Sequence, residues 1–196
     1  NPNFYVKAKD DIHLDEEKAE LGMMAVGYYA ILESAFRFNK NISIGNQSDF
    51  VAEMYAYFSK LASRNKDAWT DSALDANEIK NINKKNSLQA FPYNKYHCTS
   101  WNINQSAAII VCSEKIADDL DIPQEKRVYP LASSENNHMI GTLQRPKLYE
   151  QHGMQLAAKY ILDVCQKLKI EPNFYDLYSC FPVAVQMFAE LSLIHI

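Results

Sequence analysis

The sequence predicts an α/β fold, in which helices pack on a parallel sheet, and three observations support that prediction. The chain has 196 residues, of which 47% are hydrophobic and 22% charged, as expected for a folded core. Apolar residues at intervals of three and four dominate the first half of the chain, which indicates helices. After Ser87, short continuous apolar runs alternate with helical patterns. Such alternation is typical of layered α/β proteins.

The longest helical pattern covers residues 14–38, where the apolar positions fall on one face of a single helix. Acidic residues crowd its first turn, where exposed amide groups favour negative charge. One continuous helix is therefore expected. Gly22 and Gly27 lower its helix propensity, but small residues also let another backbone approach closely.

Two further helices are expected in the first half. Ser48 is in position to cap a helix over residues 50–62. Asp75, with Glu78 three residues later, has the spacing of a capping box at the start of a short helix. The helix over residues 50–62 carries an aromatic stripe that includes Tyr55, Tyr57 and Phe58.

The second half is predicted to alternate strands with helices. The apolar run over residues 107–112 is typical of a strand buried on both faces in a parallel sheet. The later elements are expected to be a helix over 114–120 capped by Ser113, a strand over 127–131, a helix with an inward apolar face over 156–168, a strand near 175–178 and a helix over 182–191. Pro182 suits the first turn of that last helix, because its missing amide hydrogen would be unpaired there.

Charge, segment length and cysteine spacing exclude several functions. The net charge of −4 provides no positive field for phosphates, so nucleic acids and acidic membranes are not expected partners. No apolar run approaches the ~20 residues that span a bilayer, and residues 1–11 lack the pattern of a signal peptide. The four cysteines form no Cys-x-x-Cys pair, so no metal site is expected. Cys112 and Cys165 are interpreted as reduced, buried hydrophobes.

Two histidines, His97 and His138, are candidate reactive groups. His97 and Cys98 are adjacent, and neighbours on an extended chain point to opposite faces, so they are not expected to form a nucleophile and base pair. His138 lies in a polar loop after a predicted strand, where open α/β folds place ligand groups. The alternative for His138 is an ordinary solvated loop side chain.

The segment over residues 176–182 is more informative, because it should lead from a strand into a helix, where an α/β fold displays its chemistry. Tyr178 could donate a hydrogen bond to a developing oxyanion. Ser179 and Cys180 are further candidates, and the thiolate of a cysteine near a helix N-terminus is favoured by the amide dipoles. The alternative is that these residues only pack a strand-to-helix corner.

Four motifs follow one another along the chain: AFPYNK at 90–95, WNINQSAA at 101–108, RVYPLA at 127–132 and DLYSCFPVAVQ at 176–186. In this order they resemble the acetyl-CoA acetyltransferase, or sterol-carrier-protein thiolase-like, branch of the thiolase superfamily. The resemblance extends over residues 14–191. It implies part of a duplicated α-β-α-β-α fold with a mainly helical inserted loop region. Residues 1–89 would be that insertion, 90–125 the last strand and helix of the N-terminal half, and 126–196 the truncated start of the C-terminal half.

The same resemblance implies chemistry on thioesters. Thiolases use a cysteine nucleophile, an activating histidine, a second cysteine as acid and base, and oxyanion-hole donors. The segments that bear the first three would lie outside this chain, so the chain is expected to be an internal fragment that cannot catalyse alone. Tyr178 falls where the family carries a residue that orients a water in an oxyanion hole. His138, Ser179 and Cys180 are the candidate substrate contacts.

Three functions are compatible with the sequence. The leading hypothesis is a fragment of an acyl-CoA C-acyltransferase of lipid metabolism, homodimeric when complete, with acyl-CoA or acetyl-CoA as substrate and no separate cofactor. The alternative is a non-catalytic thiolase-like protein that binds acyl-CoA or a partner subunit. A helical module that docks a protein through its aromatic stripe is the third. The expected location is cytoplasmic, with peroxisomal and mitochondrial locations as alternatives.

Overall fold

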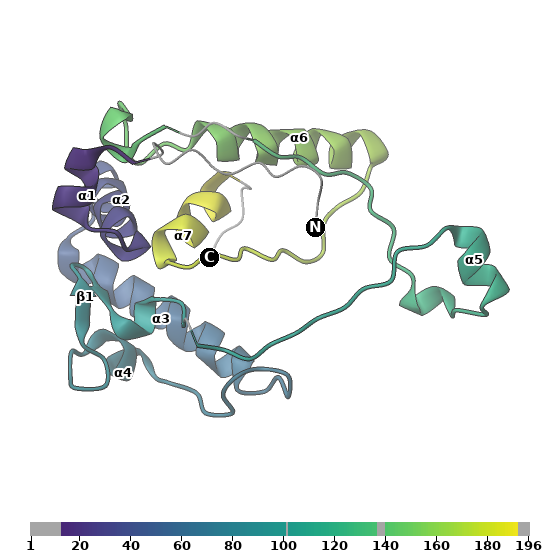
Figure 1. Cartoon of the computed structure of the whole chain (residues 1–196), viewed down its shortest axis with the longest axis horizontal. Coiled ribbons are helices and arrows are strands. Elements are labelled where there is room, and N and C mark those ends of the chain that lie inside the picture. The colour runs from purple at the N-terminus through teal and green to yellow at the C-terminus, as the bar shows by residue number, and fades with distance from the viewer. Residues whose placement is uncertain (1–12, 101, 137–139, 192–196) are drawn as a thin grey trace.

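The structure, a computed structural model, describes residues 13–100, 102–136 and 140–191, and these are mostly helical (Figure 1). The α-helices are α1 (Asp15–Leu21), α2 (Ala25–Asn39), α3 (Ile44–Ala62), α4 (Ala76–Lys80), α5 (Glu114–Asp119), α6 (His152–Leu168) and α7 (Pro182–Leu191). Short 3₁₀ helices are η2 (Lys95–His97), η3 (Gln124–Lys126) and η4 (Thr142–Gln144). The strands are β1 (Leu88–Ala90) and β2 (Tyr93–Asn94).

The single helix predicted over residues 14–38 is wrong, because the chain forms α1 and α2 with a break between them. Gly22 ends α1 with a backbone φ of 74°, a left-handed value that glycine adopts without steric cost. The expected close approach does occur at Gly27, where a Cβ atom would lie 2.2 Å from the carbonyl oxygen of Leu21. Gly27 therefore permits the end of α1 to lie directly against the start of α2.

Of the three helix caps predicted from the sequence, one is wrong and two are confirmed. Ser43, not Ser48, caps α3, since its side chain accepts a hydrogen bond of 3.1 Å from the backbone N–H of Asn46. The capping box at α4 is confirmed: the N–H of Glu78 donates to the Asp75 carboxylate at 2.8 Å, and the N–H of Asp75 donates to the Glu78 carboxylate at 2.9 Å. The predicted Ser113 cap of α5 and the start of α7 at Pro182 are also confirmed.

The predicted parallel sheet is not present among the described residues. The structure there has one two-stranded antiparallel sheet, in which Leu88 pairs with Asn94 and Ala90 with Tyr93. The segments predicted as strands, 107–112, 127–131 and 175–178, have no strand pairing. Backbone groups of a strand need hydrogen-bond partners on a neighbouring strand, and no described segment supplies such partners here.

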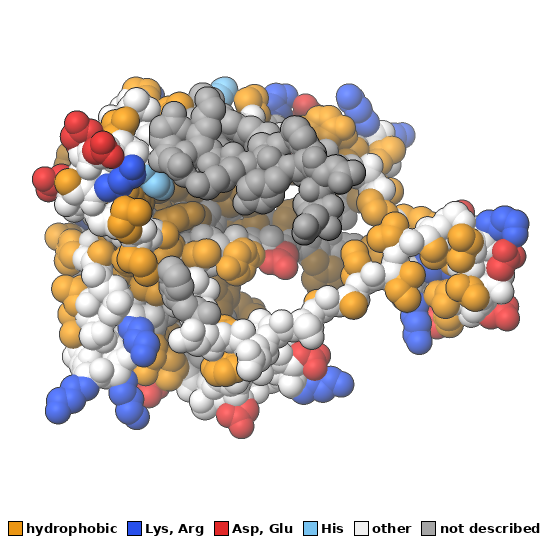
Figure 2. All heavy atoms as spheres, in the orientation of Figure 1, with side chains coloured by type: hydrophobic (Ala, Val, Ile, Leu, Met, Phe, Trp, Pro, Cys, Tyr) orange, Lys and Arg blue, Asp and Glu red, His pale blue; other side chains and the backbone are white. Residues whose placement is uncertain are grey.

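The unpaired segments leave apolar side chains in solvent. Ile109, Ile110 and Val111 are 87%, 93% and 88% exposed. Figure 1 shows the chain running out to α5 and back, and Figure 2 shows this region standing apart from the rest as an arm that carries hydrophobic side chains together with charged ones at its outer end. Cys112 lies in the same segment and is exposed, so its predicted burial is wrong. The residue types favour a buried strand, but burial requires neighbours that this segment does not have.

The core lies where α7 packs against α2. One buried cluster joins Leu32 and Phe36 of α2 to Val183 and Met187 of α7. A second cluster contains Ala30, Tyr93 and Phe181, with Cys98 and Cys180 packed beside it. Helix α6 contributes less than predicted. In its expected inward face, Leu156, Tyr160 and Leu168 are 47–51% exposed, and the only buried residue of the helix is Ala158.

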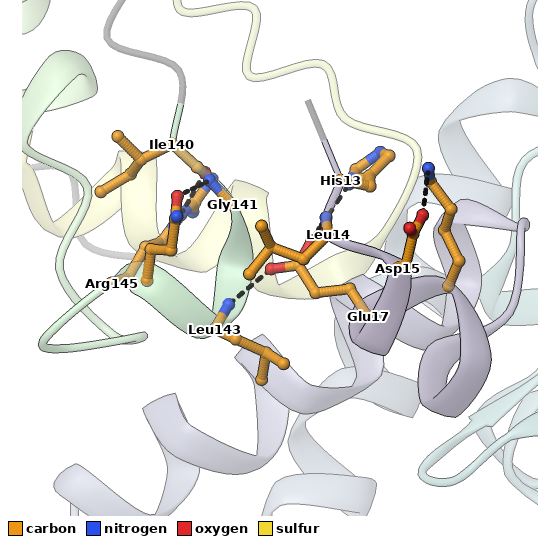
Figure 3. Close-up of polar contacts among 10 residues, drawn as sticks. His13, Leu14, Asp15, Glu17, Ile140, Gly141, Leu143 and Arg145 are labelled. Carbon is orange, nitrogen blue, oxygen red and sulfur yellow. Dashed lines mark hydrogen bonds and ion pairs between the residues drawn. The ribbon is translucent and has the colours of Figure 1, made fainter. Parts of the chain in front are cut away.

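A buried carboxylate connects the start of the described chain to the turn before α6 (Figure 3). Glu17 is fully buried, and its Oε1 accepts a hydrogen bond of 2.6 Å from the backbone N–H of Leu143, while its Oε2 accepts one of 3.2 Å from the N–H of Leu14. The His13 ring lies 3.5 Å from Oε2. A Cβ atom on Gly141 would lie 2.9 Å from Oε1, which favours glycine at that position.

Replacing Glu17 with Ala is expected to lower the free energy of unfolding by about 2 kcal/mol, because two backbone donors lose their acceptor. Urea unfolding followed by circular dichroism measures the change. Glu16→Ala is the matched control, since Glu16 is the exposed neighbour in the same helix turn. Equal losses in the two variants would contradict a specific role for the buried carboxylate.

Candidate functional site

A cleft of about 910 Å³ lies between α3, the segment that follows β2, and the extended segment before α7. Its aromatic walls are contributed by Tyr55, Phe58, Trp69, Tyr96 and Tyr178. Hydroxyl groups line it as well, including those of Ser59, Thr99, Ser100 and Ser179. Lys95 is the one charged side chain among the described lining residues. The cleft therefore combines apolar surface with neutral hydrogen-bonding groups.

Two of the four site residues proposed from the sequence line this cleft, namely Tyr178 and Ser179. Tyr178 is 78% exposed, and its hydroxyl lies 3.5 Å from the thiol of Cys180. The hydrogen bond with that thiol raises the pKa of Tyr178 above its ordinary value, so the hydroxyl is a protonated donor at neutral pH. Cys180 is half-buried and packs beside the core. His138 lies outside the described residues.

The corner that carries Tyr178 and Ser179, residues 176–182, is fixed by two hydrogen bonds and by one buried ring. The Oγ of Ser179 accepts a hydrogen bond of 3.2 Å from the N–H of Phe181, which tightens the turn. The backbone N–H of Thr99 donates to the carbonyl oxygen of Cys180 at 3.3 Å. The ring of Phe181 is buried between two tyrosines, Tyr29 and Tyr93, with ring centroids 4.6 and 5.6 Å away.

A buried polar cluster, which was not predicted from the sequence, lies next to this corner. Glu33 of α2 is 1% exposed, and its carboxylate accepts hydrogen bonds from the Tyr93 hydroxyl at 2.7 Å, from the Gln186 amide at 3.5 Å and from the Gln47 amide. The Gln47 amide also donates to the Gln186 side-chain oxygen at 2.8 Å. Desolvation raises the pKa of Glu33, and the three hydrogen bonds oppose that rise. The signal in the sequence is that Glu33 is the single carboxylate of α2 and is flanked by apolar residues on its N-terminal side.

His97 and Cys98 lie close to the cluster, but neither is set up as an activated group. His97 is 4% exposed, its Nδ1 accepts a hydrogen bond of 3.0 Å from the N–H of Asn94, and burial lowers its pKa to about 4. Burial also raises the pKa of Cys98 to about 11, and its thiol donates to the Asn94 carbonyl at 3.4 Å. At neutral pH the imidazole is therefore neutral and the thiol protonated.

The arrangement is suited to binding more than to proton transfer. Among the described residues that line the cleft, none is a histidine, aspartate or glutamate. In the described part of the chain, no group of three His, Cys, Asp or Glu side chains could hold a metal ion. None of the described helices is long and apolar enough to cross a membrane. The cleft offers rings for an apolar or aromatic ligand and hydroxyls that can bind a carbonyl oxygen.

Comparison with known proteins finds a likeness to a solved structure. No family model matches the chain, and no curated protein sequence matches it either. The chain superposes on a solved structure, a monomeric SCP2-thiolase like protein type 1 from Mycobacterium smegmatis, with a TM-score of 0.72 and 23% sequence identity. The match covers 93% of this chain and 40% of that protein, so the chain spans well under half the length of its match. The chain therefore has the fold of part of an SCP2-thiolase-like protein.

Proposed function

We propose that the full-length protein is a thiolase-like acyl-CoA C-acyltransferase of lipid metabolism, and that this chain supplies one wall of its acyl-CoA cleft. The observation that carries the proposal is the position of Tyr178 and Ser179, which line the large cleft beside the aromatic side chains of α3. Deep clefts with aromatic walls and a few hydrogen-bonding groups bind elongated organic ligands. The acyl and thioester end of an acyl-CoA, which is apolar apart from its carbonyl group, has that chemistry.

Each candidate residue has a proposed role. The Tyr178 hydroxyl donates a hydrogen bond to the thioester carbonyl or orients a water beside it. Ser179 contacts the substrate. Cys180 positions the Tyr178 hydroxyl through the hydrogen bond between them. His138 stays a proposed substrate contact on the basis of the sequence. No separate cofactor is needed for acyl transfer by this scheme.

The exposed apolar segments support a place within a larger protein. In the proposal, residues 1–89 form the helical insertion, 90–125 complete the N-terminal half and 126–196 begin the C-terminal half. The unpaired stretches at 107–112 and 127–131 then pair with strands from the rest of the fold, which satisfies their backbone groups. The full-length protein is proposed to be a homodimer. The matched mycobacterial protein, by contrast, is described as monomeric.

Replacing Tyr178 with Phe in the full-length protein is expected to weaken acetyl-CoA binding by about tenfold, because one hydrogen bond to the bound thioester is lost. Isothermal titration calorimetry measures the dissociation constant. Tyr57→Phe is the matched control, since Tyr57 lies on α3 but does not line the cleft. If the two variants bind acetyl-CoA equally well, the proposed role of the Tyr178 hydroxyl is wrong.

A second candidate function is a non-catalytic protein that binds acyl-CoA or a partner subunit. The observation in its favour is that the described lining residues include no histidine, aspartate or glutamate to serve as a general base. Thiolysis of acetoacetyl-CoA by the full-length protein separates the two functions. Turnover supports the acyltransferase, and tight binding without turnover supports the binding protein. The isolated 196-residue chain is expected to show no thiolysis.

A further inference from the structure

The buried carboxylate of Glu33 contacts three side chains that come from three different secondary-structure elements around the corner. Tyr93 comes from β2, and its ring stacks on Phe181. Gln186 comes from α7, the helix that the corner leads into. Gln47 comes from α3, the helix that supplies Tyr55 and Phe58 to the cleft. One acceptor group thus joins the elements on both sides of the cleft.

The physical effect of such a cluster is to fix orientation. A buried donor that loses its acceptor costs more than an exposed one, because water does not replace the lost partner. The carboxylate can accept about four hydrogen bonds and here accepts three, all from groups at buried or nearly buried positions. A buried network with every member satisfied holds its members in one arrangement. Phe181 follows Ser179 by two residues, so fixing its ring fixes the corner.

We propose that Glu33 is a positioning residue, which holds the corner so that Tyr178 and Ser179 face the cleft. Glu33 does not itself line the cleft, and it acts through Tyr93 and Gln186. The part of this proposal that concerns acyl-CoA rests on the proposed function. The part that concerns the corner does not.

The test compares two variants of the full-length protein. Glu33→Gln removes the charge and puts an amide against the amides of Gln47 and Gln186. The double variant Glu33→Gln/Gln47→Glu exchanges the amide and the carboxylate across the contact between α2 and α3. The side-chain oxygen of Gln186 accepts from Gln47 in the unmodified protein, so the Gln186 amide turns over and its nitrogen donates to the new carboxylate, while the new amide oxygen at position 33 accepts from Tyr93. Glu17→Gln is the matched control, because Glu17 is a fully buried carboxylate outside this cluster.

Two measurements test the order of the corner and the binding of the ligand independently. Amide hydrogen exchange over residues 180–187 is expected to speed up by about tenfold in Glu33→Gln. Acyl-CoA binding is expected to weaken by about fivefold in the same variant. The double variant is expected to return both values to near those of the unmodified protein. Glu17→Gln is expected to leave exchange over residues 180–187 unchanged.

The outcomes that overturn the proposal are specific. Unchanged exchange over residues 180–187 in Glu33→Gln overturns it, and so does a rise that is equal in all helices. If Glu33→Gln fails to fold, Tyr93→Phe replaces it, since that variant deletes one hydroxyl and keeps the ring that stacks on Phe181. It is expected to give the same pattern with a smaller amplitude. Failure of the unmodified protein to bind acyl-CoA refutes the proposed function, and the exchange data still decide the role of Glu33.

Discussion

Replacing Phe181 with Ala is expected to lower the free energy of unfolding by about 3–5 kcal/mol, the usual cost of deleting a buried aromatic ring. Phe181 is 5% exposed and lies between the rings of Tyr29 and Tyr93. Its removal deletes both ring contacts and leaves a cavity against Ala30 in the same cluster.

Urea unfolding of Phe181→Ala beside Phe174→Ala measures the effect. Phe174 is 95% exposed and lies seven residues earlier in the same extended segment. The Phe174 variant is expected to stay within about 0.5 kcal/mol of the unmodified chain, as exposed substitutions do. A similar loss of stability in the two variants would show that Phe181 is not buried as described.

Acidification from pH 6.5 to 4 is expected to destabilise the protein through His97. Its folded pKa is lowered from 6.5 to about 4 because burial disfavours the charged imidazolium. In that window the unfolded chain binds a proton that the folded chain does not, so stability falls as the pH falls. The fall in pKa corresponds to about 3 kcal/mol at most, at 1.36 kcal/mol for each tenfold change.

Glu33 acts in the opposite direction. Its folded pKa is raised, so the folded chain binds the proton more readily and gains stability as the pH falls through that raised value. The two groups therefore partly cancel. Removing the Glu33 titration, as in Glu33→Gln, is expected to steepen the loss of stability on acidification.

The measurement is the free energy of unfolding as a function of pH. His97→Asn is the informative variant, because an asparagine oxygen can replace Nδ1 as the acceptor for the Asn94 N–H but does not titrate. It is expected to flatten the profile between pH 6.5 and 4. His152→Gln, at an exposed position at the start of α6, is the control. A profile that His97→Asn leaves as steep as before would rule out His97 as the cause.

Two capping signals predicted from the sequence are confirmed, and in each of them the two hydrogen-bonding partners lie within a few residues of each other. The Asp75 and Glu78 box and the Ser113 cap depend on hydrogen bonds across three residues. The break at Gly22 was harder to predict, since the apolar spacing continues through it. The choice of Ser43 over Ser48 was also not visible, because both serines precede apolar positions and can act as caps.

Features that depend on distant residues were not predictable in the same way. The Glu33 cluster joins residues up to 153 positions apart, and neither charge nor spacing brings Gln47 and Gln186 together in the sequence. The strands predicted at 107–112 and 127–131 have suitable side chains, but a strand forms only with a partner. Of the candidate site, the sequence identified Tyr178 and Ser179 through their place before α7. It also identified Tyr55 and Phe58 of α3 as part of an aromatic stripe, but it assigned that stripe to a protein partner and not to the cleft that Tyr178 lines.

The hydrogen bond between Glu17 and Leu143 also has a consequence for synthesis of the protein on the ribosome. The two residues are 126 positions apart, and at translation rates of about 5–20 residues per second this corresponds to a delay of roughly 6–25 s. Throughout that interval the carboxylate of α1 has to stay hydrated, because its donor from the later turn has not yet been made. The first helix therefore completes its docking only after residue 143 has been synthesised.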